Sequence, residues 1–190
     1  LVLFKVPKIN WKKQKVDLDP YILGMWLGDG WGRGYSFSLN HKTDQPLLDY
    51  WKEWGEKNDA TITKGVRYTF NISSTINNTQ SGISCNKTEQ APLAKVLRKY
   101  NLVNNKHIPK EYLVNDRDTR LKVLAGLVDT DGSVRANGHE ITIAQGPANS
   151  QIIEDAHLLA ISLGFSCGVR KGRSQWTDEK TGEKKYSTYT

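Results

Sequence analysis

The chain has 190 residues, 37% of them hydrophobic, and a formal net charge of +7 at pH 7. This composition excludes an intrinsically disordered chain, and no apolar run approaches the roughly 20 residues that a membrane span needs. Its two cysteines lie far apart with no CxxC motif, which argues against a disulfide framework or a zinc site and favours a soluble protein of a reducing intracellular compartment.

The first half of the chain begins with a basic arm over residues 1–18. Asp19-Pro20 predicts a helix start, because aspartate suits an N-cap and proline suits the first helical position. That helix should end at Gly28-Asp29-Gly30. Further elements follow from apolar spacing: a strand over 35–39, a helix over 44–57, hairpin strands over 60–63 and 66–72 around a turn at Lys64-Gly65, a helix over 90–100, and an extended segment over 106–109.

The second half repeats this order of elements. We predict a helix over 116–130, a strand over 141–144, a helix over 150–163 and strands over 165–170 and 185–189. The helix over 150–163 should turn six apolar residues inward: Ile152, Ile153, Ala156, Leu159, Ala160 and Leu163. We therefore predict an α+β protein with repeats over 19–115 and 116–190. We expect the second repeat to be C-terminally incomplete, because it lacks a counterpart of the 90–100 helix and of Lys106. Either the natural chain continues past Thr190 or the second half is pared down.

Two apolar helices of this scheme end in the same way, each in an aspartate followed by a glycine. Gly24 and Gly28 lie four residues apart on one helix face, and so do Gly126 and Thr130. Small residues at this spacing let two helix backbones approach closely. The helix over 20–29 has almost no polar face, so it should be buried nearly all round. If the helices pack along their small faces, their C-terminal ends lie side by side.

This packing would bring the carboxylates of Asp29 and Asp131 together at two helix C-termini. Like charges repel, and the helix dipole disfavours negative charge at that end. A hard divalent cation with oxygen ligands, Mg²⁺ in particular, would relieve the repulsion. Two ordinary Asp-Gly turns are the alternative explanation, which the repetition after matching helices weakens. Spacing excludes an EF-hand and a dinucleotide-binding glycine motif.

The motifs resemble those of the LAGLIDADG homing endonucleases. Leu124 to Gly132 departs from that nine-residue motif at two positions, and Ile22 to Gly30 is a looser copy. Lys106-His107-Ile108-Pro109 is similar to the K-x-I-P segment of intein-encoded members. The resemblance spans about residues 19–190. Leu1 and the last residues do not match intein splicing segments, so an intein parent would contribute only its endonuclease part; a free-standing or intron-encoded enzyme stays open.

The resemblance implies two pseudo-symmetric αββαββα-type repeats, with the motif helices packed at the centre and two antiparallel saddle-shaped sheets over DNA. It implies that Asp29 and Asp131 bind divalent metal, with backbone carbonyls of Gly28 and Thr130 as further ligands. Lys106 corresponds to the active-site lysine of the first repeat. The implied cofactor is Mg²⁺, with Mn²⁺ or Ca²⁺ able to replace it for binding. Without a second lysine, the two DNA strands need not be cut equally well.

Polar and basic residues alternate with apolar ones on several predicted strands, which suits sheets that face a DNA groove. Any one of them alone is more simply a solvated side chain. Candidates in the first half are Arg33, Tyr35, Ser38, Asn40, His41, Lys42, Lys64, Arg67 and Asn71. Candidates in the second half are Arg135, Asn137, His139, Thr142, Gln145, Arg170, Lys171, Arg173, Lys184 and Lys185.

The sequence therefore predicts a monomeric, Mg²⁺-dependent endonuclease that hydrolyses double-stranded DNA at a long site, with no membrane partner. The alternative is a non-cleaving DNA- or RNA-binding protein of the same type, either maturase-like or a decayed nuclease. A basic protein with no nucleic-acid role is a third, weaker hypothesis. Binding to random duplex with a steep salt dependence separates the last from the other two.

Overall fold

The computed structural model describes residues 8–31, 36–76, 91–136, 138–178 and 183–190. Three of the predicted DNA-contacting residues, Arg33, Tyr35 and Asn137, lie outside these ranges. The described part contains helices and small antiparallel sheets, which confirms the α+β class. The pseudo-symmetric two-repeat arrangement, with its repeat boundaries, stays a prediction.

The first half builds a three-stranded sheet on a helix. The bounds are α1 Pro20–Asp29, β1 Ser36–Ser38, α2 Gln45–Lys57, β2 Ala60–Lys64, β3 Thr69–Ser74 and α3 Pro92–Lys99. The strand order is β1-β3-β2, with every neighbour antiparallel. α2 packs under the sheet, where Phe37 of β1 stacks on Trp51 with ring centroids 4.4 Å apart.

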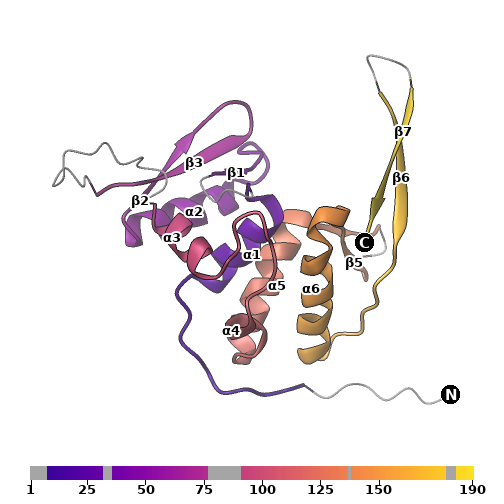
Figure 1. Cartoon of the computed structure of the whole chain (residues 1–190), viewed down its shortest axis with the longest axis horizontal. Coiled ribbons are helices and arrows are strands. Elements are labelled where there is room, and N and C mark those ends of the chain that lie inside the picture. The colour runs from indigo at the N-terminus through magenta and orange to yellow at the C-terminus, as the bar shows by residue number, and fades with distance from the viewer. Residues whose placement is uncertain (1–7, 32–35, 77–90, 137, 179–182) are drawn as a thin grey trace.

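The second half places its strands in two separate pairs. The bounds are α4 Lys110–Leu113, α5 Arg117–Asp131, β4 Gly132–Val134, β5 Ile141–Ile143, a 3₁₀ turn Pro147–Asn149, α6 Ser150–Ser162, β6 Gly172–Thr177 and β7 Lys184–Tyr189. β4 pairs with β5 and β6 pairs with β7, both antiparallel. α1 and α5 lie side by side in the middle of the molecule, α6 flanks α5, and the β6–β7 ribbon extends away from them (Figure 1).

Most elements lie where the sequence predicts them, and the starts of the two central helices carry clear capping signals. Asp19 caps α1 by accepting hydrogen bonds from the backbone N–H groups of Tyr21 and Ile22. Asp116 caps α5 through the N–H of Thr119. Ile22 to Leu27 are all buried, so α1 is enclosed on every side as expected. The six apolar residues predicted to face inward over 150–163 are also buried.

Two strand predictions are wrong. The hairpin turn does not lie at Lys64-Gly65: β2 continues through Lys64, and β3 begins only at Thr69. The intervening Val66 is 80% exposed and Arg67 has a φ of 56°, so the apolar alternation from Val66 belongs to the turn. Residues 165–170 form no strand. β7 pairs along its whole length with β6, which starts only at Gly172, so β7 offers residues 165–170 no partner.

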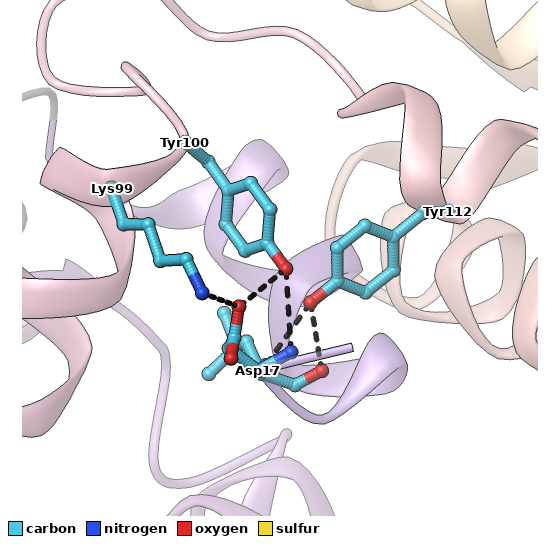
Figure 2. Close-up of polar contacts among 5 residues, drawn as sticks. Asp17, Lys99, Tyr100 and Tyr112 are labelled. Carbon is cyan, nitrogen blue, oxygen red and sulfur yellow. Dashed lines mark hydrogen bonds and ion pairs between the residues drawn. The ribbon is translucent and has the colours of Figure 1, made fainter. Parts of the chain in front are cut away.

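The end of the N-terminal segment is held against the first half at Asp17 and Leu18. The Asp17 carboxylate accepts hydrogen bonds from Lys99 Nζ at 2.6 Å and from the Tyr100 hydroxyl at 2.8 Å (Figure 2). The Tyr112 hydroxyl accepts from the Leu18 N–H at 3.1 Å and donates to the Leu18 carbonyl at 2.9 Å. The segment thus joins α3 to α4 immediately before α1 begins.

The beginning of the same segment contacts the second half. Arg120 of α5 is 1% exposed, and its guanidinium donates to the Ile9 carbonyl and to the Ser162 hydroxyl. The same guanidinium lies 4.6 Å from the centroid of a Trp11 ring. The Ile9 N–H donates to the Ser162 carbonyl at 3.0 Å. Residues 9–18 therefore connect both halves on the side away from the β6–β7 ribbon (Figure 1).

Candidate active site

The α1–α5 interface is a direct contact between helix backbones. A Cβ atom at Gly24 would lie 2.2 Å from the Val123 carbonyl oxygen, and one at Gly126 would lie 2.4 Å from the Tyr21 carbonyl oxygen. No side chain fits at such distances, so only glycine permits this approach. The third small residue, Gly28, packs against the fourth, Thr130, whose Oγ1 would lie 2.1 Å from a Cβ at Gly28. All four predicted packing residues meet along one seam.

The seam brings the C-terminal ends of α1 and α5 together, and with them Asp29 and Asp131. A Cβ at Gly28 would lie 3.2 Å from Asp131 Oδ2, which places the Asp131 carboxylate against the last turn of α1. The chain leaves both helices in the same extended conformation, at Gly30 (φ −72°, ψ 145°) and Gly132 (φ −80°, ψ 143°). The two acids are thus delivered by equivalent turns.

Burial and mutual repulsion disfavour the charged forms of these acids. The pKa of Asp29 rises to about 7, first because of burial and then because of the negative charge of Asp131. Burial also raises the pKa of Asp131, against the opposing effects of Lys106 and of a hydrogen bond from Gln145. Strongly shifted groups with a specific charged partner are typical of functional sites.

Lys106 supplies the positive charge beside the two carboxylates. Its Nζ donates hydrogen bonds to the Leu27 carbonyl at 2.9 Å and to the Gly28 carbonyl at 3.2 Å, and it lies 5.0 Å from the centroid of a Trp26 ring. The side chain is buried, which lowers the pKa of Lys106 to about 8 even though Asp131 and Asp29 both favour the charged form. An ammonium with such a pKa can hold or release a proton near neutral pH.

The extended segment that carries Lys106 is fixed by α6. The N–H of Ile108 donates to Asp155 Oδ2 at 2.8 Å, and both Ile108 and Asp155 are buried. Gln151 Nε2 donates to the other oxygen of the same carboxylate at 3.0 Å. The position of the lysine at the end of α1 is therefore set by a helix of the second half.

Gln145 belongs to this site, which the sequence analysis missed. It was predicted as a DNA-contacting residue next to the strand over 141–144. It lies just beyond β5, but it is 7% exposed and donates a hydrogen bond from Nε2 to Asp131 Oδ2. Its backbone N–H and carbonyl pair with those of Thr190, each at 3.1 Å. Because these tertiary contacts fix the residue, strand alternation alone gave no signal of its role.

The donor set fits a hard divalent cation. Asp29 and Asp131 offer carboxylate oxygens at helix ends, where the last carbonyl groups have no partner within the helix. Mg²⁺ in particular is commonly held by one or two protein carboxylates together with water and substrate phosphates. The Gly28 carbonyl already accepts from Lys106, although a carbonyl oxygen has a second lone pair. Asp29 and Asp131 are thus the residues that would hold the metal.

The raised pKa of Asp29 predicts a pH dependence of stability in the metal-free protein. Between its ordinary value of 3.8 and about 7, the native state binds a proton that the unfolded state has released. The free energy of unfolding should therefore fall as pH rises through this interval. In urea unfolding with a chelator present, Asp29→Asn should remove this part of the decline in the free energy of unfolding. Replacement of the exposed Asp49 by asparagine should leave the decline unchanged. Parallel pH curves for wild type and Asp29→Asn would contradict the assignment.

The first-half DNA candidates lie around the outer face of the β1-β3-β2 sheet. Ser38 and Asn71 share that face with the threonines of β2, since their positions alternate with the buried Phe37, Phe70 and Ile72. The hairpin turn presents Arg67 to solvent. Four more candidates cluster at the edge: Lys64 Nζ lies 3.1 Å from His41 Nε2, and Asn40 accepts from the N–H of the exposed Lys42.

The second-half candidates whose side chains the structure describes are exposed, apart from Gln145. Arg135 forms an ion pair with Glu140 at 2.9 Å, and His139 and Thr142 lie on the same β4–β5 hairpin. Exposed positions of the segment before β6 and of the ribbon itself hold Arg170, Lys171, Arg173 and Lys184. For Lys185 the structure describes the backbone in β7 but not the side chain. Across the described ranges, no helix is both long and apolar enough to cross a membrane.

Comparison with known proteins identifies the second part of the chain. Over 162 residues, 85% of this chain, the sequence is 28% identical to the replicative DNA helicase DnaB of Mycobacterium intracellulare, and it covers 22% of that relative's length. Residues 107–190, which include α5, Asp131 and Gln145, match the sequence model of the homing endonucleases. The resemblance to homing endonucleases drawn from the motifs is thus confirmed over residues 107–190.

Proposed function

We propose that this chain is a site-specific endonuclease of the LAGLIDADG type, which hydrolyses double-stranded DNA with Mg²⁺. The observation that carries this proposal is the meeting of Asp29 and Asp131 at the ends of two helices packed through Gly24 and Gly126. The homing endonuclease match supports the DNA-cleaving activity for residues 107–190. Asp29 and Lys106 lie outside that match, so their roles rest on geometry.

The chemistry proposed is attack of water on a phosphodiester phosphorus and departure of the sugar oxygen. A divalent cation, when bound, supplies the polarisation of the phosphate and the acidity of the water. Asp29 and Asp131 would hold the cation in position, and Gln145 fixes the rotamer of Asp131 through its hydrogen bond. The ammonium of Lys106 offsets the negative charge that develops in the transition state. Because one chain contributes both acids, a monomer suffices.

The net charge of +7 supports a polyanionic substrate. Exposed basic side chains lie on the hairpin turn of the first half and along β6 and β7. Phosphate contacts of this kind provide affinity without sequence information and make binding depend steeply on salt. The proposed DNA therefore lies across the strands of both halves, with the acid pair between them.

An intein origin is also part of the proposal. An endonuclease carried within a helicase gene would give two findings. Part of its sequence would match the homing endonucleases, and most of it would be similar to a limited part, here about a fifth, of a replicative helicase. The Lys106 to Pro109 segment supports the same assignment through its similarity to intein-encoded members.

Lys106→Met should separate catalysis from stability. We expect the cleavage rate to fall about 100-fold, the cost typical of removing one transition-state donor. The free energy of unfolding should change by no more than about 1 kcal/mol, since relief of ammonium burial offsets the loss of two hydrogen bonds. Single-turnover cleavage and urea unfolding measure the two effects. The exposed Lys110→Met is the matched control, and equal cleavage by wild type and Lys106→Met would exclude the assigned role.

In-vitro selection of cleaved sites from a randomised duplex library tests the proposed function. The wild-type chain with Mg²⁺ should enrich one long site, which then supports binding with a steep salt dependence. Enrichment of a bound but uncut site, with Mg²⁺ and Mn²⁺ alike, would instead establish a non-cleaving binding protein.

A further inference from the structure

The segment that carries Lys106 lies outside the helices and strands of the described chain. Residues 105–109 are extended, and no described strand pairs with them. The segment is anchored at Tyr100 and Tyr112, six residues to either side of Lys106, whose hydroxyls bond to residues just before α1 (Figure 2). Six extended residues span about 20 Å, so these two anchors alone leave the position of the ammonium undetermined.

A buried side chain of α6 holds the middle of this segment. The Ile108 N–H donates to Asp155 Oδ2 at 2.8 Å, and Ile108 and Asp155 are 1% and 6% exposed. The other carboxylate oxygen of Asp155 accepts from Gln151 Nε2, one helical turn earlier. Among the described residues, no basic side chain forms an ion pair with Asp155. The buried carboxylate thus links the segment to α6 instead of balancing a positive charge.

Lys106 depends on this link because its own side chain is flexible. The ammonium is carried on a four-carbon stem, and within the described chain Nζ donates to the carbonyls of Leu27 and Gly28 at the end of α1. The backbone of Lys106 lies two residues from Ile108. A shift of about 1 Å in a catalytic group can lower the rate on the order of 100-fold. Movement of Ile108 away from Asp155 would therefore displace the ammonium from its place beside the two acids.

We propose that Asp155 is a positioning residue for Lys106, which keeps the ammonium at the end of α1 by binding the backbone two residues further on. This inference rests on the proposed function, because it takes Lys106 to act in DNA cleavage. It makes a lysine beside α1 depend on a helix of the second half. The competing explanation is that burial of the Ile108 side chain in the hydrophobic core anchors the segment without Asp155.

Three variants of α6 separate these explanations. Asp155→Ala removes the acceptor, Asp155→Asn keeps one oxygen for the Ile108 N–H, and Glu154→Ala removes a neighbouring exposed carboxylate as the matched control. In single-turnover cleavage of the selected site, Asp155→Ala should be about tenfold slower than the wild type, whereas the other two should stay within about threefold. Binding of the same duplex in Ca²⁺ should change by no more than about threefold in any variant. Circular dichroism checks that each variant is folded.

Repeating the comparison in Lys106→Met distinguishes positioning from a purely structural role. If Asp155 acts through Lys106, adding Asp155→Ala to Lys106→Met should lower the rate by less than about twofold, because the group that it positions is already gone. A general loss of structure would instead multiply the two defects.

Gln151→Ala carries the same comparison if Asp155→Ala does not fold. Gln151 is exposed, and its hydrogen bond orients the other oxygen of Asp155. Loss of that hydrogen bond should slow cleavage about threefold when Lys106 is present. It should have no further effect in the Lys106→Met background.

Chemical labelling follows the ammonium itself, without DNA or metal. Lys106 is 8% exposed, whereas Lys110 is exposed and serves as an internal reference. With a limiting amount of acetic anhydride, mass spectrometry should show several-fold faster acetylation of Lys106 in Asp155→Ala than in the wild type, relative to Lys110. Asp155→Asn and Glu154→Ala should match the wild type.

Unchanged cleavage by folded Asp155→Ala would overturn the positioning role, since burial of the Ile108 side chain would then suffice. An unchanged rate in Gln151→Ala, where that variant takes its place, has the same meaning. A tenfold loss that persists in the Lys106→Met background would also overturn it. Faster acetylation of Lys106 in Asp155→Ala, together with a wild type that cuts no duplex, would instead remove the proposed function and leave the contact standing. The two failures are therefore distinguishable.

Discussion

Replacement of Asp29 or Asp131 by asparagine should lower the rate of DNA cleavage by about a thousandfold or more, while binding of the selected site in Ca²⁺ changes by only about threefold or less. Asparagine keeps the shape of the side chain but removes the charge that a hard cation needs. Burial and, after it, the negative charge of Asp131 raise the pKa of Asp29 to about 7. Either substitution should remove the repulsion between the two carboxylates. Single-turnover cleavage and equilibrium binding measure the two effects separately.

Asp129→Asn is the matched control for this experiment. Asp129 lies on α5 only two residues before Asp131, but its exposed carboxylate accepts a hydrogen bond from the Tyr21 hydroxyl at 2.6 Å instead of joining the pair. An asparagine oxygen can still accept that hydrogen bond, so cleavage should stay close to that of the wild type. If Asp29→Asn cleaves as well as Asp129→Asn does, the acid pair is not the active site.

Gly126→Val should have the largest effect on the fold. The new side chain would overlap the Tyr21 carbonyl oxygen and the backbone nitrogen of Met25, neither of which can move without displacing α1. We expect the free energy of unfolding to fall by about 3 kcal/mol or more, at the upper end of the cost of overpacking a core. Urea unfolding measures the change. The same backbone displacement would separate Asp29 from Asp131 and stop cleavage.

Ala125→Val controls for the β-branched side chain itself. Ala125 is the preceding residue of α5 and its side chain is exposed, so valine there should cost well under 1 kcal/mol in helix propensity alone. Equal stability of the two variants would show that α1 and α5 do not pack through their glycines.

The central helices could be predicted because their signals are local. Asp19 and Asp116 are capping residues in sequence and in structure. The four-residue spacing of Gly24 with Gly28 and of Gly126 with Thr130 indicated which faces could approach, and the structure brings those faces together. From that one contact the proximity of the two acids follows geometrically.

The remaining features depend on contacts between distant residues. Gln145 reaches Asp131 only because β5 folds back beside α5 and its end pairs with Thr190. Residues 165–170 have strand-like composition, but no strand among the described residues pairs with them. Arg120 has no sequence signal for burial, and its contacts with Trp11 and Ile9 arise from the path of the N-terminal segment. Local periodicity carries no information about such pairings.

The most direct test of the two-acid site is linearisation of a supercoiled plasmid that carries the selected site. With the wild-type chain, product should be absent in a chelator and should appear as Mg²⁺ is added, since the proposed hydrolysis needs a cation held by Asp29 and Asp131. Tight binding of that plasmid with both strands intact at every Mg²⁺ and Mn²⁺ concentration would contradict the account.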